Sequence, residues 1–188
     1  MPERSLSTER IAGIKSNKSR ITLHFCVNAS RSHKLKPWIV SQFRRPTCFR
    51  AAQIDPKRLD CKYRFNKKAW VTAAIFEEWL RWFDQQMAGR KVVLLLDNFS
   101  AHVAAYNELS SLPEGYSLQN TEVVWLPPNS TSKTQPLDQG IIASFKAIYK
   151  RCWIHFISEE FDKGRDPYQT MNLLEAFRFI RRAWQEVS

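Results

Sequence analysis

The sequence predicts an α/β fold in which a mixed β-sheet is flanked by helices. Two β-forming segments separated by a polar turn come first and predict an antiparallel hairpin. Two short apolar runs follow, and the helix-length segments around them predict parallel strands. At 188 residues and 22.1 kDa, the chain has the size of one domain. A domain of this length can bury about 70% of its unfolded surface without disulfides or structural metals.

The expected hairpin follows a polar, basic arm formed by residues 1–20. Residues 21–28 are rich in β-forming side chains and predict the first strand, which a polar turn ends. Residues 35–40 predict the second strand, and Pro37 inside it favours a position near a sheet edge. Residues 44–68 are basic and interrupted by prolines, so we expect an irregular surface segment there.

Helices and strands alternate in the rest of the chain. Thr72 can cap a helix whose apolar residues recur at helical spacing, and Gly89 fits the end of that helix. Residues 92–96 are continuously apolar, which is typical of a central strand covered on both faces. The remaining expected elements are a short helix at 100–112, a buried strand at 122–126, a long helix at 141–156 and a last helix at 173–184.

This order, β-β-α-β-α-β-α-α, is that of a ribonuclease-H-like domain lacking its first strand. We therefore expect a ribonuclease-H-like mixed sheet flanked by helices, with the first strand missing. The expected regions are a basic arm at 1–20, a core at 21–157 and a C-terminal helical extension at 158–188.

The net charge of +11, from 29 Lys and Arg against 18 Asp and Glu, favours a polyanionic partner such as nucleic acid. The alternative is a domain that is merely basic. No segment approaches the ~18 apolar residues that span a bilayer, and the N-terminus has no signal-peptide core, so we expect an intracellular protein. The four cysteines form no C-x-x-C pair, which argues against a zinc site.

Two aspartates are the main candidates for a metal site. Asp97 directly follows the apolar run 92–96, and Asp138 precedes the long helix. The predicted topology brings both to the same sheet edge, and paired carboxylates suit Mg²⁺ or Mn²⁺, which prefer oxygen ligands. Each also has a structural explanation, because Asp97 or Ser100 could cap the following helix and Asp138 could interact with a helix dipole.

Other polar residues could assist or contact phosphates. Asn98 and His102 follow Asp97, and His102 could instead serve packing or capping. The loop residues Asn129, Ser130 and Thr131 could contact DNA or only order the loop. Basic side chains could line a DNA path or form a solvated face; the candidates are Lys15, Lys18, Arg20 and Lys146, and the clusters at 34–36 and 44–45.

Two motifs resemble those of a known family. Leu94-Leu95-Leu96-Asp97-Asn98, followed by Ala101-His102, resembles the second acidic motif of DDE superfamily endonucleases. A second segment resembles the third acidic motif of the same family: Leu126-Pro127-Pro128-Asn129-Ser130-Thr131-Ser132 with Gln135-Pro136-Leu137-Asp138-Gln139-Gly140. This long motif is similar to that of the pogo/Tigger branch of mariner-like transposases, and the resemblance covers about residues 10–152.

The resemblance implies a metal-dependent enzyme that acts on DNA. Such transposases carry three acidic residues on a ribonuclease-H-like core and use Mg²⁺ or Mn²⁺ to cut and rejoin transposon DNA. Carried over by position, Asp97 is the second acid and Asp138 the third, and both are catalytic residues and metal ligands. The family also implies a nuclear protein, with DNA and a full-length transposase as partners.

The sequence departs from the family pattern at the first of the three acidic residues. Residues 1–20 contain no Asp, and Glu3 and Glu9 lie in the polar arm. The first aspartates, Asp55 and Asp60, come after the hairpin. We therefore expect a truncated, catalytically incomplete transposase domain. The alternatives are a domesticated, non-catalytic nucleic-acid-binding protein, and an inert product whose sheet lacks a central strand.

Overall fold

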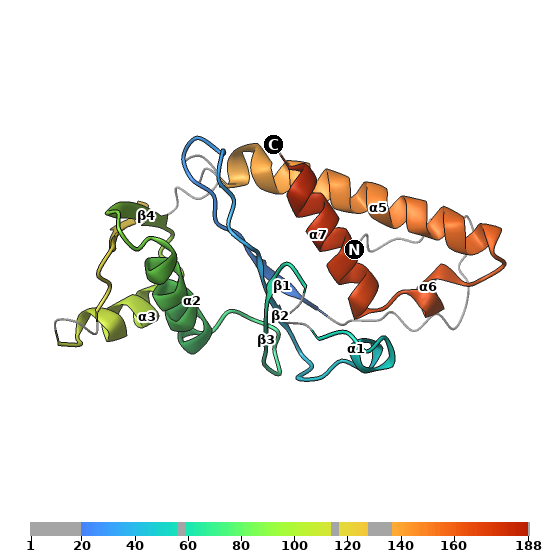
Figure 1. The fold of residues 1–188 in the computed structure, drawn as a ribbon, viewed down its shortest axis with the longest axis horizontal. Helices are drawn as coiled ribbons and strands as arrows, with labels where there is room; N and C mark the ends of the chain where they lie inside the picture. The colour runs from blue at the N-terminus through green and yellow to red at the C-terminus, as the bar shows by residue number, and fades with distance from the viewer. Residues whose placement is uncertain (1–19, 56–58, 114–116, 128–136, 188) are drawn as a thin grey trace.

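The structure is a computed structural model that describes residues 20–55, 59–113, 117–127 and 137–187. It is an α/β fold, as predicted, but its described strands form two sheets (Figure 1). The first sheet has the order β1 (Thr22–His24), β2 (Trp38–Ser41) and β3 (Lys62–Phe65), and the second pairs β4 (Val92–Leu96) with β5 (Thr121–Trp125).

Helices cover both faces of the first sheet. Figure 1 shows the second sheet with two helices on one side of the first sheet, and the long C-terminal helices on the other. The helices are α1 (Thr47–Ala51), α2 (Ala73–Gln86), α3 (Ser100–Ser110), α5 (Ile142–Asp162), α6 (Pro167–Thr170) and α7 (Leu173–Glu186), with a π-helical turn η2 (Leu137–Ile141) before α5. Trp38 of β2 packs in the core with α2, and its neighbour Ile39 packs in the core with α7. No helix in the described ranges is long and apolar enough to cross a membrane.

The predicted hairpin is confirmed, because β1 pairs antiparallel with β2 and Thr22 lies opposite Val40. The predicted edge position of β2 is wrong, since β3 pairs in parallel with its other side. Pro37 immediately precedes the strand, so its missing N–H falls outside the ladder. Its carbonyl still accepts a hydrogen bond from Lys62 N, at 2.9 Å.

Residues 44–68, expected to be irregular, contain α1 and β3. Strand β3 carries Lys62 and Arg64 and therefore lacks an apolar pattern. The charged ends lie over aromatic rings: Lys62 Nζ is 5.6 Å from the ring centre of Trp82, and Arg64 Cζ is 4.8 Å from that of Trp38. Long basic side chains can cover apolar surface in this way, which explains why the sequence pattern did not reveal the strand.

Helix α2 supplies the centre of the first core. Thr72 caps it as predicted, accepting a hydrogen bond from Ile75 N at 3.4 Å. The apolar face predicted from the spacing is buried and contains Phe76, Trp79, Leu80, Phe83 and Met87. This face packs in one cluster with Leu35 and Trp38 of the hairpin, Leu94 and Leu96 of β4, and Ala105 and Leu109 of α3.

Strand β4 is covered on one face only, so the prediction of a strand buried on both faces is wrong. Leu94 and Leu96 are buried in the first core, whereas Val93 and Leu95 are 59% and 50% exposed. The cause is that β4 has a single strand partner among the described residues, β5, while α2 and α3 pack on one side. The parallel pairing of these two strands is confirmed.

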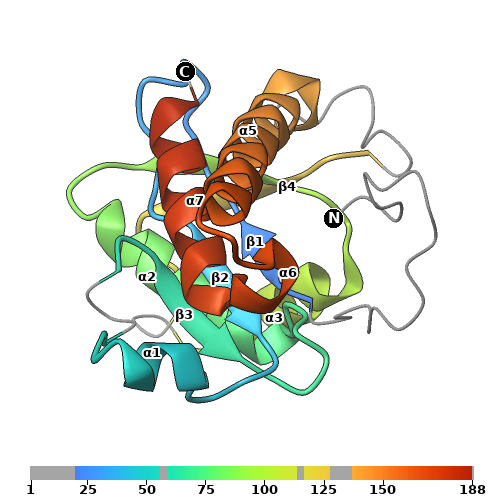
Figure 2. The same ribbon diagram turned by 90° about the vertical axis from the view of Figure 1, so that its right-hand side faces the viewer.

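A second core lies between the first sheet and the C-terminal helices. Figure 2 shows α7 lying alongside α5, in front of the first sheet. Helix α5 runs unbroken across residues 157 and 158, and the domain boundary expected there stays a prediction. The buried residues of this core include Ile39 of β2, Phe49 of α1, Phe145 of α5, and Phe177, Ile180 and Trp184 of α7.

The end of α7 is fastened to the hairpin. Lys34 Nζ donates hydrogen bonds to the carbonyl oxygens of Trp184 at 2.8 Å, Gln185 at 3.2 Å and Val187. A cation at the C-terminal end of a helix also interacts favourably with the helix dipole. In return, Trp184 Nε1 donates to the carbonyl oxygen of Leu35 at 2.9 Å.

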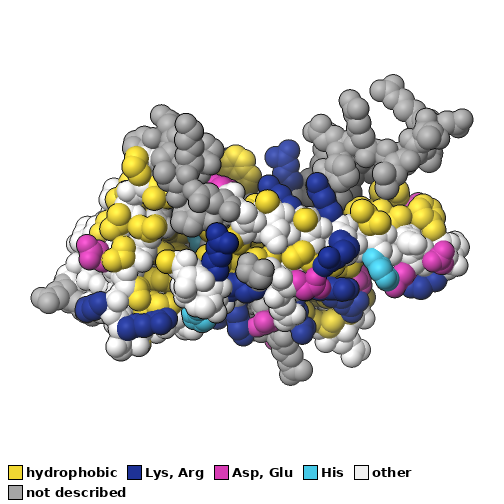
Figure 3. Space-filling model, turned by 90° about the horizontal axis from the view of Figure 1, so that it is seen from above, with side chains coloured by type: hydrophobic (Ala, Val, Ile, Leu, Met, Phe, Trp, Pro, Cys, Tyr) yellow, Lys and Arg dark blue, Asp and Glu magenta, His cyan; other side chains and the backbone are white. Residues whose placement is uncertain are grey.

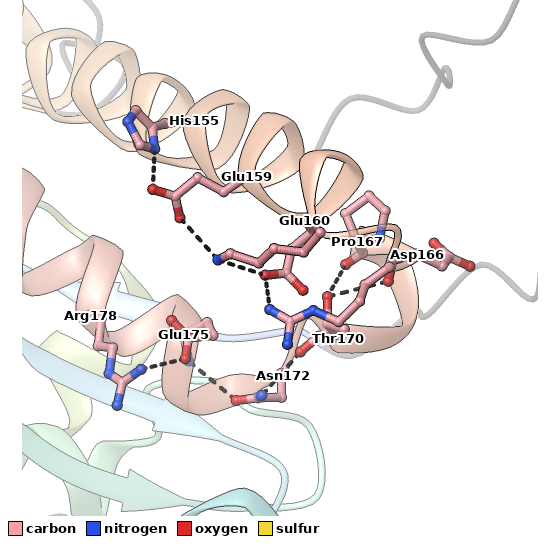
Figure 4. Close-up of polar contacts among 11 residues, drawn as sticks. His155, Glu159, Glu160, Asp166, Pro167, Thr170, Asn172, Glu175 and Arg178 are labelled. Atoms are coloured by element: carbon pink, nitrogen blue, oxygen red, sulfur yellow. Dashed lines mark hydrogen bonds and ion pairs between the residues drawn. The ribbon is translucent and has the colours of Figure 1, made fainter.

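Charged side chains shape the corner between α5 and α7 (Figure 4). Glu160 is buried and accepts a hydrogen bond from Arg165, with Lys163 Nζ 3.5 Å from the same carboxylate. The hydrogen bond from Arg165 keeps the pKa of Glu160 below its ordinary value. Asn172 then caps α7 by accepting a hydrogen bond from Leu174 N at 2.9 Å.

Asp84, near the end of α2, holds the start of β5. Its buried carboxylate accepts hydrogen bonds from Gln119 N at 3.0 Å and Asn120 N at 2.7 Å. Burial opposes ionisation, but the backbone hydrogen bonds outweigh it, so the pKa of Asp84 lies below its ordinary value. Such a carboxyl stabilises the fold above its unfolded pKa, and the stabilisation is lost as the pH falls through the folded pKa.

We expect Asp84→Asn to lower the free energy of unfolding at neutral pH by about 1–3 kcal/mol, because a charged acceptor of two backbone N–H groups is lost. Urea unfolding at neutral and acidic pH measures this, and the difference should begin to shrink below about pH 4, where the carboxyl of the unfolded chain becomes protonated, and should be lost below the folded pKa. The exposed carboxyl of Glu122 on β5 provides a control, Glu122→Gln. If Asp84→Asn lowers the free energy of unfolding by the same amount at every pH, the prediction is contradicted.

Candidate functional site

Asp97 stands at the carboxyl end of the second sheet, as the sequence predicts. The apolar strand β4 ends at Leu96, and Asp97 is the next residue. The neighbouring strand ends at the same level, because Leu96 pairs with Trp125 and its carbonyl accepts a hydrogen bond from Leu126 N at 2.8 Å. Parallel strands deliver their following residues to one edge, which is where α/β sheets bind ligands.

The Asp97 carboxylate is oriented by the start of α3. Its Oδ1 atom lies 2.6 Å from His102 Nδ1 and 3.4 Å from Phe99 N, which donates to it. A histidine that carries its proton on Nδ1 would donate to this carboxylate. His102 and Asp97 are both partly buried, so the contact is shielded from water on several sides.

Aromatic packing fixes the position of His102. Its ring centre lies 3.9 Å from that of Phe76 in α2 and 5.3 Å from that of Phe99. Packing against these two rings holds the His102 ring in place, and the ring in turn contacts the Asp97 carboxylate. The role of His102 in function stays a prediction.

His24 of β1 is a neighbour of this arrangement that the sequence reasoning missed. Its ring centre is 4.4 Å from that of Trp79 and 6.1 Å from that of His102. Burial, together with the charge of His102, lowers the pKa of His24 to about 3, although the charge of Asp97 acts in the opposite direction. His24 is therefore neutral at physiological pH. No pattern in the sequence marked it, because the apolar Leu23 and Phe25 alternate with His24 and lie on the opposite face of the strand, in the second core.

Asn98 joins the ends of the two parallel strands. Its Nδ2 donates a hydrogen bond to the carbonyl oxygen of Leu126, the residue that follows β5 and whose N–H donates to the carbonyl oxygen of Leu96. Asn98 was predicted as an accessory residue of the site. This hydrogen bond gives Asn98 a structural role, because it connects the segments that leave the two strands of the second sheet.

Asp138 lies in another element, the π-helical turn η2, and its side chain is exposed. The buried Ile141 anchors the end of this turn in the second core. Within the described ranges, no group of three or more His, Cys, Asp or Glu side chains is arranged to hold a metal ion. The assignment of Asp97 and Asp138 as joint metal ligands and catalytic residues stays a prediction.

Few of the predicted DNA-contacting residues can be placed. Arg20 is exposed just before β1, and Lys146 is exposed on α5 next to the buried Phe145. Figure 3 shows Lys and Arg side chains spread along the face seen from above, most of them in its middle part. Lys15, Lys18, Asn129, Ser130 and Thr131 lie outside the described residues.

Comparison with known proteins identifies a family. Residues 18–188 match the family model described as DDE superfamily endonuclease. This match confirms the resemblance predicted from the motifs around Asp97 and Asp138. No solved structure matches the chain.

Curated relatives are similar over almost the whole chain. ARS-binding protein 1 of Schizosaccharomyces pombe is 42% identical over 184 residues, which cover 98% of this chain and 35% of the relative. CENP-B homolog protein 2 of the same organism is 41% identical with the same coverage. Tigger transposable element-derived protein 4 of Mus musculus is 32% identical over 173 residues, 91% of this chain and 31% of the relative. The chain thus spans about a third of the length of these relatives.

The contact between Asp97 and His102 predicts energetic coupling. We expect Asp97→Ala and His102→Ala together to lower the free energy of unfolding by about 1–2 kcal/mol less than the sum of the two single changes, because either one already removes the hydrogen bond. Urea unfolding of the wild type, both single variants and the double variant measures the coupling. The exposed His155 on α5 supplies a control pair, Asp97→Ala with His155→Ala, which should be additive. Additivity of the Asp97 and His102 changes contradicts the prediction.

Proposed function

Because this chain belongs to the DDE superfamily endonuclease family, we propose that it is a transposase-derived domain that binds DNA without cutting it unaided. The observation that carries the proposal is the family match over residues 18–188 of a chain whose net charge is +11. A polycation of this size neutralises phosphates wherever its Lys and Arg side chains reach the backbone of a nucleic acid. Similarity to a protein named for binding ARS elements supports the same conclusion.

Asp97 is proposed as a divalent-metal ligand. A carboxylate at the carboxyl end of a strand, held by a histidine and a backbone N–H, is a suitable oxygen donor for Mg²⁺ or Mn²⁺. Asp138, exposed at the start of η2, is the second proposed ligand. A bound ion of this kind activates a water or hydroxyl nucleophile and stabilises the leaving oxygen in phosphoryl transfer.

We also propose that the two sheets are parts of one ribonuclease-H-like arrangement. The contact of His24 in β1 with His102 in α3 supports it, because it brings the first sheet close to the carboxyl end of β4. In this arrangement, residues 21–157 form the core and 158–188 the helical extension. Nuclear localisation, and assembly with a full-length transposase, are proposed from the family alone.

The catalytic half of the proposal rests on the acidic residues of the sequence. Asp97 and Asp138 match two acids of the family pattern, and residues 1–20 offer no aspartate for the first. Two carboxylates bind a pair of divalent ions more weakly than three, because fewer negative oxygens offset the charge of the ions.

We expect no nicking of supercoiled plasmid DNA by the 188-residue chain with Mg²⁺ or Mn²⁺, beyond the level seen with Asp97→Asn. Conversion of supercoiled to open-circular DNA on a gel measures this. Metal-dependent nicking by the wild type that Asp97→Asn abolishes would show that the chain carries a complete active site.

We expect DNA binding that weakens steeply with salt, because each neutralised phosphate contributes about −0.9 to the slope of log affinity against log salt concentration. Fluorescence anisotropy of a labelled duplex over a salt series gives this slope. Absence of binding at low salt would refute the proposed function.

A further inference from the structure

One edge of the first sheet carries exposed aromatic rings together with cations. Strands β2 and β3 are parallel, so the loops that follow Ser41 and Phe65 leave the sheet side by side. We call this surface the aromatic–basic edge, and it consists of Phe43, Phe65 and Trp70 with Arg20, Arg44, Arg45, Lys67 and Lys68. It contains neither Asp97 nor Asp138.

The three rings are open to solvent. Phe43 is 51% exposed, Phe65 44% and Trp70 53%. Two of them carry a cation over the ring: Arg44 Cζ lies 5.9 Å from the centre of Phe65, and Lys68 Nζ lies 5.9 Å from that of Trp70. Leaving large rings in water forgoes the stabilisation that burial of such side chains provides.

The first loop is held in place by hydrogen bonds to the sheet. Tyr63 Oη donates to the carbonyl oxygen of Phe43, and Phe43 N donates to Ser41 Oγ at 3.2 Å. Phe65 is the last residue of the neighbouring strand β3. The first two rings therefore stand on ordered backbone.

The second loop is ordered by one asparagine. Asn66 Oδ1 accepts hydrogen bonds from Lys68 N at 3.1 Å and Trp70 N at 3.2 Å. Thr22 Oγ1 of β1 donates to the carbonyl oxygen of Ala69 at 2.7 Å, and Ala69 adopts a left-handed φ of 54°. A surface ordered before binding loses less conformational entropy when a ligand arrives.

The charge of this edge has one sign. All five basic side chains are exposed, and residues 20–24, 41–45 and 65–70 include no Asp or Glu. A polyanion fits this charge, and flat rings fit ligands that can stack. The exposed face of β4, with Val93 and Leu95, has neither rings nor cations and lacks this combination.

We propose that the aromatic–basic edge binds unpaired nucleic-acid bases, which stack on Phe43, Phe65 and Trp70 while the surrounding Lys and Arg side chains neutralise phosphates. A paired base keeps its faces inside the duplex stack, so only single-stranded or distorted DNA can use the rings. The inference rests on the proposed function, because it assigns a class of DNA to a domain proposed to bind DNA.

The test compares single-stranded and duplex DNA. We expect Phe65→Leu combined with Trp70→Leu to weaken binding of a labelled oligothymidine by at least about 10-fold, since stacking contributes about 1–3 kcal/mol per base. Affinity for a duplex of the same length should stay within about twofold, because the charges remain. Fluorescence anisotropy at constant salt gives both affinities.

Two controls accompany the double variant. Tyr168→Leu removes an exposed ring on α6, away from this edge, and should change neither affinity. Lys68→Gln removes a cation and should weaken both kinds of DNA. Thermal unfolding of each variant verifies the fold, which we expect to be unchanged because the substituted side chains are exposed.

Each result decides the matter. Equal losses for both DNAs, or no loss for either, overturn the stacking assignment while leaving the proposed DNA binding intact; in the second case the edge suits a protein partner instead. A wild-type chain that binds neither DNA refutes the proposed function and this inference with it.

Discussion

The packing of α2 is the interaction on which the rest of the structure depends. The two described sheets share no strand pairing, but Trp38 of the first sheet and Leu94 and Leu96 of the second are buried in the same core around this helix. Phe76 and Leu80 have no exposed surface, and each fully buried side chain of this size contributes about 1.5–3 kcal/mol. Polar contacts reinforce the arrangement at its margins, through Arg64 with Glu78 and through Asp84 with the start of β5.

The position of the candidate metal ligand follows from this packing. Phe76 of α2 supports the ring of His102, which holds the carboxylate of Asp97. The same helix supports His24 through Trp79. A core substitution in α2 can therefore reach the carboxyl end of β4 without touching the aspartate.

Sequence reasoning predicted the elements whose patterns are local. The spacing of the apolar residues and the Thr72 cap predicted α2, and the apolar run predicted β4 together with the place of Asp97. Strand β3 was missed because Lys62 and Arg64 lie over tryptophan rings, which no pattern within four residues reveals. The exposed face of β4 was missed because burial depends on which strands and helices surround it.

In the candidate site, too, local patterns were predicted and long-range contacts were missed. Asp97 could be found from its place after a strand, whereas its neighbour His24 lies far away in the chain and depends on how β1 approaches α2. The family motifs located Asp138, but a motif does not give the distance between two carboxylates. Distances between residues far apart in the chain depend on long-range packing, which cannot be read from a single sequence.

The fastening of α7 to the hairpin has a consequence for the time course of synthesis. Lys34 meets the carbonyl oxygen of Trp184, 150 residues further along the chain. At about 5–20 residues per second, a ribosome needs on the order of 10 s to make the intervening segment. During that interval Ile39 of β2 lacks the helix that covers it. The nascent hairpin therefore emerges with an uncovered apolar face, which a cell must shield until the last helix arrives.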